Sequence, residues 1–256
     1  MEDMFSLKGK VAIVTGGNGG IGRGIAQGFA GVEADVVIAA RNPKKTADAA
    51  AEIRKEFGVR VLEIEANVQQ EKSIESMVKT VIDEFGRIDV LVNNAGINIR
   101  KMPQDLTAAE YDEVLSTNLR AAFLCSKAVY PAMKKSGGGK IINIGSMTSI
   151  FGGAKLLPYG TSKGGIVAMT RSLAVAWAPD NIQVNAILPG WIDTELTQRA
   201  RIELDGLNER ILTHTPVGRW GRPEDLQGTA IFLATSASDF VTGVSLPVDG
   251  GYSVNI

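Results

Sequence analysis

Tyr159 and Lys163 lie four residues apart in the stretch PYGTSKGG, which covers residues 158–165. If this stretch is helical, the i,i+4 spacing places both side chains on one face, with Cβ atoms about 5 to 6 Å apart. An ammonium so close stabilises a phenolate and lowers the pKa of the phenol. The pair could therefore act as a general acid/base, although any helix can carry a Tyr and a Lys one turn apart.

The composition of the chain is that of an ordinary globular protein, with 45% hydrophobic and 21% charged residues. We expect one domain over residues 1–256, because alternating α/β folds of this length often form a single domain. The 27 Lys and Arg nearly balance the 28 Asp and Glu, which gives no electrostatic reason to expect nucleic acid or an anionic membrane as a partner. The expected ligand is a small molecule.

Cys125 is the only cysteine in the sequence, which excludes an intramolecular disulfide and is typical of a reducing compartment. Its surroundings, FLCSKAV, predict a buried position in a helix. The first ten residues carry two acids and no apolar h-region. The longest run without a charged residue, 141–154, has 14 residues and is too short to span a bilayer. We expect a cytoplasmic protein.

Short β-branched stretches alternate with longer helical patterns along the whole chain. The predicted strands cover residues 11–15, 35–40, 59–65, 88–93, 140–144, 182–188 and 243–248. The helical patterns include 42–57, 70–85 and 106–135. In the last of these, Thr107 and Glu110 have the spacing of a capping box.

These apolar strands predict burial on both faces, and their alternation with helices predicts a parallel sheet with right-handed crossovers. The expected fold is α/β, a single-domain doubly wound Rossmann fold with a seven-stranded parallel sheet and helices on both faces. Such sheets bind ligands beyond the carboxyl ends of their strands, where the strand order reverses. Functional residues should therefore directly follow the predicted strands.

The glycine-rich sequence TGGNGGIG, residues 15–22, follows the first predicted strand and opens a helix. Glycines let a backbone approach a ligand closely, and a helix N-terminus offers free N–H groups to a pyrophosphate. This position favours dinucleotide binding, and the absence of a following Gly-Lys-Ser/Thr argues against a nucleoside-triphosphate P-loop. The candidate contacts are Gly16, Asn18, Gly20, Ile21 and Gly22.

Arg41 follows the second predicted strand, where dinucleotide sites present an acid to the ribose hydroxyls of NAD or a base to the 2′-phosphate of NADP. Ala40 stands where the acid would be expected. This favours NADP(H) and leaves NAD(H) possible, since Asn18 is not the second basic group that would strengthen the case. The alternative interpretation of Arg41 is a solvated side chain at a strand end.

Three more motifs follow predicted strands: NNAG at 93–96, GSMTS at 145–149 and PGWIDT at 189–194. Together with TGGNGGIG and YGTSK, they resemble the short-chain dehydrogenase/reductase family, and the resemblance continues to VDGG at 248–251. The stretches NIR after NNAGI and TPVGRWGRPEDL are similar to the gluconate and deoxygluconate dehydrogenases of that family.

The resemblance implies a role for each matching residue. Tyr159 matches the general acid/base, Lys163 the lysine that lowers its pKa and holds the nicotinamide ribose, and Ser146 the hydroxyl that orients the substrate oxygen. Asn118 matches the helix asparagine that holds a water in the proton relay. The further cofactor contacts implied are Asn67, Val68, Asn94, Ala95, Gly96, Pro189, Gly190, Ile192 and Thr194.

Asn67 departs from the family pattern, which has Asp at this position to accept a hydrogen bond from the adenine amino group. An asparagine carbonyl can also accept that bond, so Asn67 stays in the expected site. No metal site is expected, because one His and one Cys provide no ligand cluster. The single histidine, His214, is expected to be a loop or lid residue.

The implied reaction is the NAD(P)(H)-dependent interconversion of a secondary alcohol and a ketone. It requires a proton donor or acceptor with a pKa near the operating pH, whereas a free tyrosine titrates near 10. Lys163 and the positive charge of oxidised nicotinamide are expected to lower the pKa of Tyr159.

Substrate specificity is expected from residues 97–103, residues 147–158 and a lid at about 191–220. A small polar substrate such as a sugar acid, sugar or polyol is favoured. Basic residues in these segments could meet a carboxylate or lie in solvent: Arg100, Lys101, Lys155, Arg199 and Arg201.

Three alternatives remain: a 3-oxoacyl thioester (acyl-carrier-protein) reductase, a general carbonyl reductase and, more remotely, a redox-silent dinucleotide-binding regulator. The family's ketoreductases hold the acidic carrier with arginines on two helices, and the matching positions here are Pro131 and Val175. A regulator would usually lack part of the catalytic set, which is complete in this chain.

The segment 164–178, GGIVAMTRSLAVAWA, is apolar over more than one face, as in a helix that packs on both a sheet and a partner. Family members commonly assemble as tetramers through such helices. The resemblance therefore implies a homotetramer.

Overall fold

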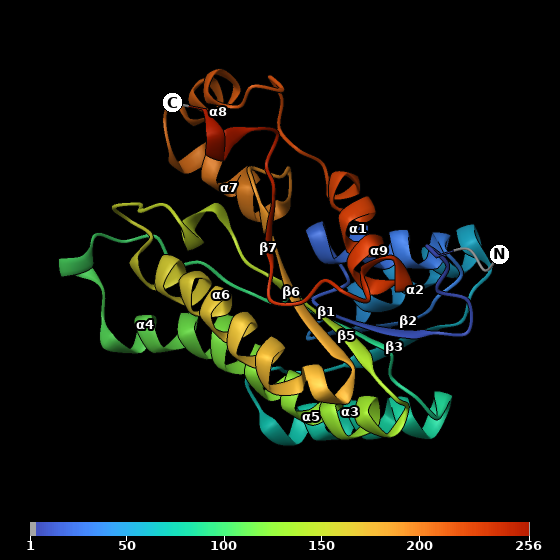
Figure 1. Cartoon of the computed structure of the whole chain (residues 1–256). Helices are drawn as coiled ribbons and strands as arrows, with labels where there is room; N and C mark the ends of the chain where they lie inside the picture. Colours follow the sequence, from blue (N-terminus) through green and yellow to red (C-terminus); the bar gives the residue numbers. More distant parts are fainter. Residues whose placement is uncertain (1–3, 256) are drawn as a thin grey trace.

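A parallel β-sheet forms the centre of the structure (Figure 1). The computed structural model describes residues 4–255, apart from the side chains of residues 199 and 203. The strands are β1 (Val11–Thr15), β2 (Asp35–Ala40), β3 (Val61–Glu65), β4 (Val90–Asn93), β5 (Gly139–Ile144), β6 (Ile182–Pro189) and β7 (Ser245–Val248). Over the described residues, these seven strands pair in the order β3-β2-β1-β4-β5-β6-β7, which confirms the predicted doubly wound fold.

Helices cover both faces of the sheet (Figure 1). One face carries α1 (Gly20–Gly31), α2 (Pro43–Phe57) and α9 (Gln227–Ala234), and the other carries α3 (Glu71–Phe85), α4 (Ala108–Leu115), α5 (Ala121–Lys135) and α6 (Leu157–Trp177). Successive residues of β1 supply both interfaces, since Val14 packs in one core with Phe29 of α1 and Ile13 in the other with Met77 of α3. Burial on both faces explains why this strand is apolar throughout.

The third helical pattern is not one continuous helix. Its start is as predicted, because the Thr107 hydroxyl accepts from the backbone N–H of Glu110 and the Glu110 carboxylate accepts from that of Thr107. A π-helical turn at Ser116–Arg120 then separates α4 from α5. Turns of this kind add a residue to a helix and occur frequently at functional sites. This one contains Asn118.

A two-residue shift at the start of three strands is the main difference in strand boundaries. β3, β4 and β7 begin at Val61, Val90 and Ser245, whereas the sequence predicted strands from residues 59, 88 and 243. β3 is an edge strand in which only Val61 is fully buried, Leu62 and Ile64 are half-buried, and Glu63 and Glu65 are exposed. The uniform burial expected of every strand therefore does not extend to the edge of the sheet.

Cys125 is buried in α5, as predicted, and burial raises the pKa of its thiol to about 12. The thiol therefore stays protonated and acts as a small apolar side chain. No helix among the described residues combines the length and hydrophobicity needed to cross a bilayer. The described part of the chain also has no group of three or more His, Cys, Asp or Glu side chains placed to hold a metal ion.

Candidate active site

A cleft of about 930 Å³ lies where the carboxyl ends of the strands meet. It forms beside β1, at which the strand order reverses between β2 and β4. All the predicted cofactor contacts except Gly22 line this cleft, together with Ser146. The expectation that functional residues follow strands therefore agrees with where these side chains lie.

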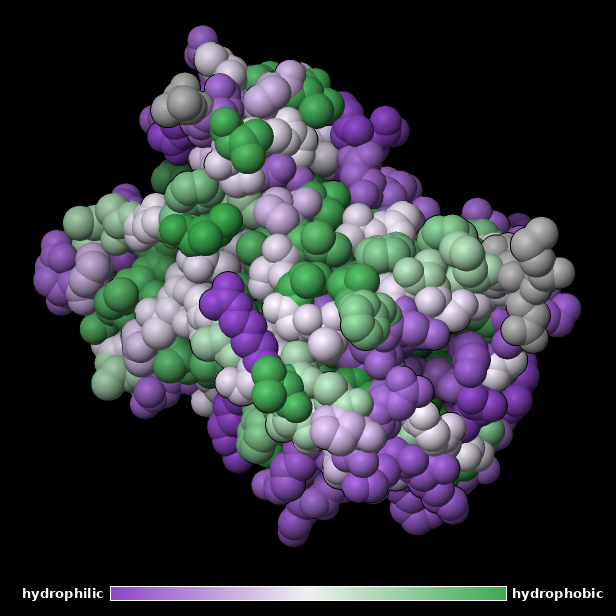
Figure 2. Space-filling view, in the orientation of Figure 1, coloured by the Kyte–Doolittle hydropathy of each residue, from purple (hydrophilic) through white to green (hydrophobic). Residues whose placement is uncertain are grey.

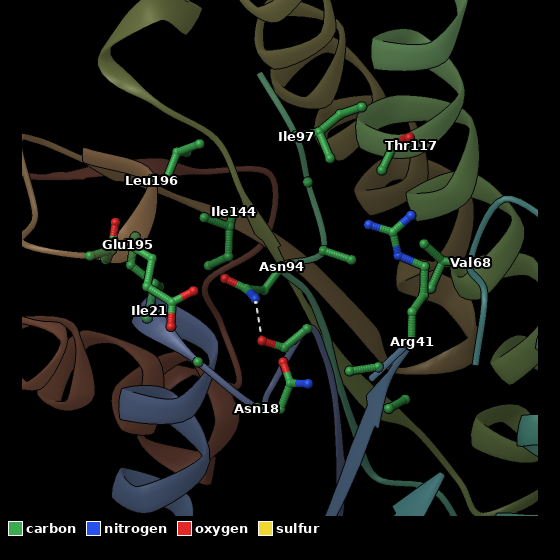
Figure 3. A pocket seen from close by; sticks show the side chains of 18 of the residues that line it. Asn18, Ile21, Arg41, Val68, Asn94, Ile97, Thr117, Ile144, Glu195 and Leu196 are labelled. Atoms are coloured by element: carbon green, nitrogen blue, oxygen red, sulfur yellow. Dashed lines mark hydrogen bonds between the residues drawn. The ribbon is translucent and has the colours of Figure 1, made fainter. Parts of the chain in front are cut away.

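The glycine-rich loop is built for the close approach of a ligand. Gly16 has φ +66°, a conformation that side chains with a Cβ rarely adopt. A Cβ on Gly22 would lie 2.4 Å from Asn94 Nδ2 and 2.5 Å from the Gly16 carbonyl oxygen, so no side chain fits beneath the loop. Asn94 Nδ2 donates to the carbonyls of Thr15 and Gly16 at 2.9 and 3.2 Å and fixes the loop to the end of β4 (Figure 3).

These features fit a dinucleotide pyrophosphate, because the loop exposes backbone N–H groups at the start of α1. At the far end of the cleft, Figure 3 shows the Arg41 guanidinium beside Val68. Asn67 Oδ1 accepts a 3.1 Å hydrogen bond from the backbone N–H of Gln69. A carbonyl oxygen has a second lone pair, so Asn67 can still accept a bond from an adenine amino group.

Lys163 lies beneath Tyr159 at the other end of the cleft. Its side chain is buried, and Nζ lies 5.6 Å from the centre of the phenol ring. The ammonium donates a 2.6 Å hydrogen bond to the carbonyl oxygen of Ile144 at the end of β5. Ser146, which follows β5, lies close enough to the Tyr159 hydroxyl to lower the pKa of the phenol. Three of the four predicted catalytic side chains therefore meet at one point of the cleft.

The protein alone raises the pKa of Tyr159, whereas the lowering expected from the sequence included the charge of oxidised nicotinamide. Burial raises this pKa, and the nearby Ser146 hydroxyl and the positive charge of Arg100 lower it by less. Burial also lowers the pKa of Lys163 to about 8. Loss of contact with water disfavours the charged form of each group, the phenolate of Tyr159 and the ammonium of Lys163. The i,i+4 spacing thus brings the two groups together but does not by itself acidify the phenol.

Asn118 lies next to this group but does not line the cleft. Its buried amide accepts from the backbone N–H of Ile97 at 2.8 Å and donates to the Ile97 carbonyl at 2.9 Å. Its other N–H donates to the Ser162 hydroxyl at 3.1 Å. The π-helical turn therefore lets Asn118 hold the segment after β4 against α6. The water predicted at this residue stays a prediction.

The segment predicted as a lid contains two short helices, α7 (Glu195–Glu203) and α8 (Leu207–His214), which stand above the sheet (Figure 1). His214 is the last residue of α8, and its ring packs edge-on against that of Tyr252 at 4.6 Å between centres. The sole histidine thus belongs to the lid segment, as predicted.

Two of the basic residues near the cleft are engaged with acids. Lys101 lies 2.5 Å from Glu110 of α4. Arg201 pairs with Asp193 at 3.2 Å and stacks 3.8 Å from the ring centre of Trp220. Both charges already have an acidic partner within the protein, so we assign neither residue to the substrate.

The other predicted basic residues fall into different groups. Lys155 is exposed, and the side chain of Arg199 lies outside the described residues. Arg100 is close enough to Tyr159 for its charge to lower the pKa of the phenol. Of the predicted basic residues, Arg100 is therefore the one whose charge acts on the Tyr159 phenol.

The sequence analysis missed two charged residues that line the cleft. Lys45, in the first turn of α2, and Glu195, at the start of α7, form an ion pair of 2.5 Å. Lys45 lies four residues after Arg41, and Glu195 directly follows Thr194. This proximity in the sequence to two predicted contacts was the only indication that they could line the cleft. Nothing in the sequence indicated that the two would meet.

Comparison with known proteins places this site in a family. The family model described as enoyl-(acyl carrier protein) reductase matches residues 16–253. The chain is 42% identical over 250 residues to 2-dehydro-3-deoxy-D-gluconate 5-dehydrogenase of Dickeya dadantii, with 97% of both chains covered. It is 39% identical over 256 residues to 5-keto-D-gluconate 5-reductase of Escherichia coli, with both chains fully covered.

A solved gluconate 5-dehydrogenase from Burkholderia cenocepacia, in complex with NADP and tartrate, has the same fold. It superimposes with a TM-score of 0.94 at 36% identity, and 99% of each chain is covered. The match spans the sheet, the glycine-rich loop and the lid, since almost the whole of both chains is included. The ordered motifs, the topology and these relatives together show that the chain belongs to the short-chain dehydrogenase/reductase family.

Proposed function

We propose that the protein is an NADP(H)-dependent oxidoreductase that interconverts a secondary alcohol and a ketone on a sugar acid of the gluconate type. The observation that carries the proposal is that Ser146, Tyr159 and Lys163 lie together in the same cleft as the glycine-rich loop. A proton-transfer group and a dinucleotide site thus share one cavity. The relatives named above act on keto or deoxy derivatives of gluconate.

Within this proposal each side chain has a defined task. When bound, the nicotinamide ring accepts or supplies the hydride. The Tyr159 hydroxyl exchanges a proton with the substrate oxygen, and Ser146 orients that oxygen by a second hydrogen bond. Lys163, held by the Ile144 carbonyl, keeps a positive charge under the phenol at pH below about 8. Asn118 fixes the backbone that borders this group.

The position of Arg100 favours a substrate that carries a carboxylate. The charge of Arg100 acts on Tyr159, so an acid bound between them would place its carboxylate near the guanidinium and its hydroxyl near the phenol. The solved relative from Burkholderia cenocepacia holds tartrate, a hydroxy acid with carboxylates close to its carbinol carbons. Both observations favour a sugar acid over an uncharged polyol.

NADP is favoured over NAD by the chain and by its relatives. Arg41 lines the cleft after β2 and, among the described residues, makes no hydrogen bond or ion pair. The Burkholderia cenocepacia enzyme carries NADP, as does a putative 2-deoxy-D-gluconate 3-dehydrogenase from Agrobacterium tumefaciens, which is 36% identical with a TM-score of 0.91. An arginine at this place is suited to a 2′-phosphate.

A direct test follows nicotinamide absorbance with NADP and NAD in parallel, across sugar acids, uncharged polyols, simple secondary alcohols and short 3-oxoacyl thioesters. Turnover of a gluconate derivative with NADP is the expected result. Turnover of thioesters alone would contradict the proposal and move the protein to the acyl-carrier branch. That branch is disfavoured because Val175, 80% exposed on α6, offers no cation to an acidic carrier.

The same proposal includes a homotetramer. Phe123 on α5 and Val175 on α6 are exposed at 44% and 80%, and Figure 2 shows pale and green surface over α6. Exposed apolar side chains on two neighbouring helices are suited to a partner subunit. A monomeric mass in light scattering at micromolar concentration would contradict this assembly. A cytoplasmic location is proposed with it, in keeping with the single buried thiol.

A further inference from the structure

Lys45 lies against the glycine-rich loop. Its Nζ is 2.9 Å from the position that a Cβ on Gly19 would occupy. The residue belongs to the first turn of α2, and its backbone N–H donates a 3.0 Å hydrogen bond to the side chain of the N-cap residue Asn42. The ammonium therefore fills the space that a side chain at position 19 would take, inside the cleft that Arg41 also lines.

Glu195 holds the Lys45 ammonium in this place. Its carboxylate lies 2.5 Å from Nζ, and it is the first residue of α7, directly after Thr194. The Thr194 methyl group is 3.2 Å from the position of a Cβ on Gly20, so this end of α7 packs on the loop. In Figure 3, Glu195 and Ile21 lie on one side of the cleft and Arg41 on the other, with Asn18 between them.

The ion pair is exposed enough to exchange partners. The Lys45 and Glu195 side chains are 39% and 73% exposed, so water weakens their attraction. A phosphate monoester carries a charge of about −1.5 to −2 at pH 7 and three acceptor oxygens, whereas a carboxylate carries one negative charge. A phosphate that reaches this point is the stronger partner for the ammonium.

We propose that Lys45 is the second cationic ligand, with Arg41, of the 2′-phosphate that distinguishes NADP from NAD, and that this phosphate replaces Glu195 at the ammonium. The inference rests on the proposed use of NADP and adds a specificity residue to it. It also supplies the second basic group that the glycine-rich loop lacks, from α2 in place of the loop.

Two observations favour the 2′-phosphate over the pyrophosphate. Lys45 belongs to the segment that follows β2, as Arg41 does, and dinucleotide folds read the 2′ position there, whereas the pyrophosphate sits on the first turn of α1. Asn18 Nδ2 donates a 3.0 Å hydrogen bond to Thr46 Oγ1, which ties the outer side of the loop to α2 beside Lys45. The ammonium thus lies between the outer side of the loop and the start of α7, on a helix that begins two residues after Arg41.

Calorimetric titration of NADP and of NAD into the full-length protein tests the assignment without relying on turnover. Lys45→Gln should weaken NADP binding about tenfold and NAD binding less than about twofold, because a charged hydrogen bond to phosphate is lost. Lys45→Arg should restore most of the NADP affinity. Glu195→Gln should tighten NADP binding by about two- to fivefold, since a competing carboxylate is removed.

Lys44→Gln is the matched control. Lys44 is the neighbouring lysine, is 88% exposed and pairs with Asp48 at 3.1 Å, and it does not line the cleft. Its replacement should change neither affinity. Urea midpoints measured for every variant identify any loss of binding that comes from unfolding, and the Glu195→Gln result stands on its own if Lys45→Gln fails to fold.

Equal weakening of NADP and NAD by Lys45→Gln would assign the ammonium to the pyrophosphate and overturn the proposal. Unchanged NADP binding in both Lys45→Gln and Glu195→Gln would overturn it as well. A wild-type protein that does not bind NADP would instead refute the proposed function, so the two failures are distinguishable.

Discussion

The Lys163 ammonium lies 5.6 Å from the centre of the Tyr159 ring while it donates a 2.6 Å hydrogen bond to the Ile144 carbonyl at the end of β5. The helix that carries both side chains is thereby fixed to the sheet through its lysine. Since burial lowers the pKa of Lys163 to about 8, the positive charge beneath the phenol itself depends on pH. The Ile144 carbonyl therefore fixes the position of the Lys163 ammonium, whereas burial determines the pH range in which it is charged.

Tyr159→Phe removes only the proton-transfer group. We expect turnover to fall by at least about 10²-fold, because general acid/base catalysis typically contributes 10² to 10⁴. Dinucleotide affinity, measured by calorimetry, should stay within about twofold of the wild type. Tyr111→Phe, on α4 and outside the cleft, is the control and should behave as wild type. Near-normal turnover of Tyr159→Phe would refute the assigned general acid/base.

Lys163→Met tests the lowered pKa through stability. Lys163 titrates near 10.5 when unfolded and near 8 when folded, so between these pH values the unfolded chain binds the extra proton and the free energy of unfolding rises with pH. Below pH 8 both states are protonated and the cost of burying the charge is fully present. The methionine variant lacks this dependence.

The difference in unfolding free energy, wild type minus Lys163→Met, should therefore increase by about 1 kcal/mol from pH 8 to pH 9. Urea denaturation at pH 7, 8 and 9 measures it. A difference that stays constant over this range would show that Lys163 keeps its ordinary pKa in the folded protein.

The strand pattern was sufficient to predict the sheet and the location of the cleft. Runs such as 11–15 and 35–40 match β1 and β2 residue for residue, because strands buried on both faces are apolar throughout and end where polar ligand contacts begin. The glycine-rich loop was recognisable for the same reason, since Gly16 and Gly22 occupy places where a side chain cannot fit.

Features that depend on contacts between distant segments were not predictable. The π-helical turn around Asn118 has no signal in local propensity, and its effect is seen in the hydrogen bonds that Asn118 makes with Ile97 and Ser162. The Lys45–Glu195 pair joins residues 150 positions apart. The raised pKa of Tyr159 also depends on how much protein surrounds the hydroxyl, which i,i+4 spacing does not reveal.

Arg41→Ala should weaken NADP binding about tenfold to a hundredfold, because hydrogen bonds to charged groups contribute about 1.5 to 3 kcal/mol. NAD binding should change less than about threefold, since NAD has no 2′-phosphate. Calorimetric titration of both dinucleotides measures the difference. Arg60→Ala is the control, because Arg60 pairs with Glu84 at 2.6 Å and does not line the cleft. Equal losses for the two dinucleotides would refute the phosphate contact of Arg41.

Arg100→Gln should reduce selectivity for an acidic substrate. The ratio of kcat/KM for a gluconate derivative to kcat/KM for an uncharged polyol should fall about tenfold, because one charged hydrogen bond to the carboxylate is lost. Removal of the guanidinium also removes a charge that lowers the pKa of Tyr159, which accepts the proton when an alcohol is oxidised, so the acidic limb of the pH–rate profile should move to higher pH with both substrates.

The matched control is Lys101→Gln at the neighbouring position. Lys101 pairs with Glu110 at 2.5 Å, so its replacement should alter neither the selectivity ratio nor the pH profile. Steady-state kinetics with both substrates from pH 6 to pH 10 separate the two effects of Arg100. A shifted profile with an unchanged ratio would mean that Arg100 acts on the phenol alone and that the carboxylate is bound elsewhere.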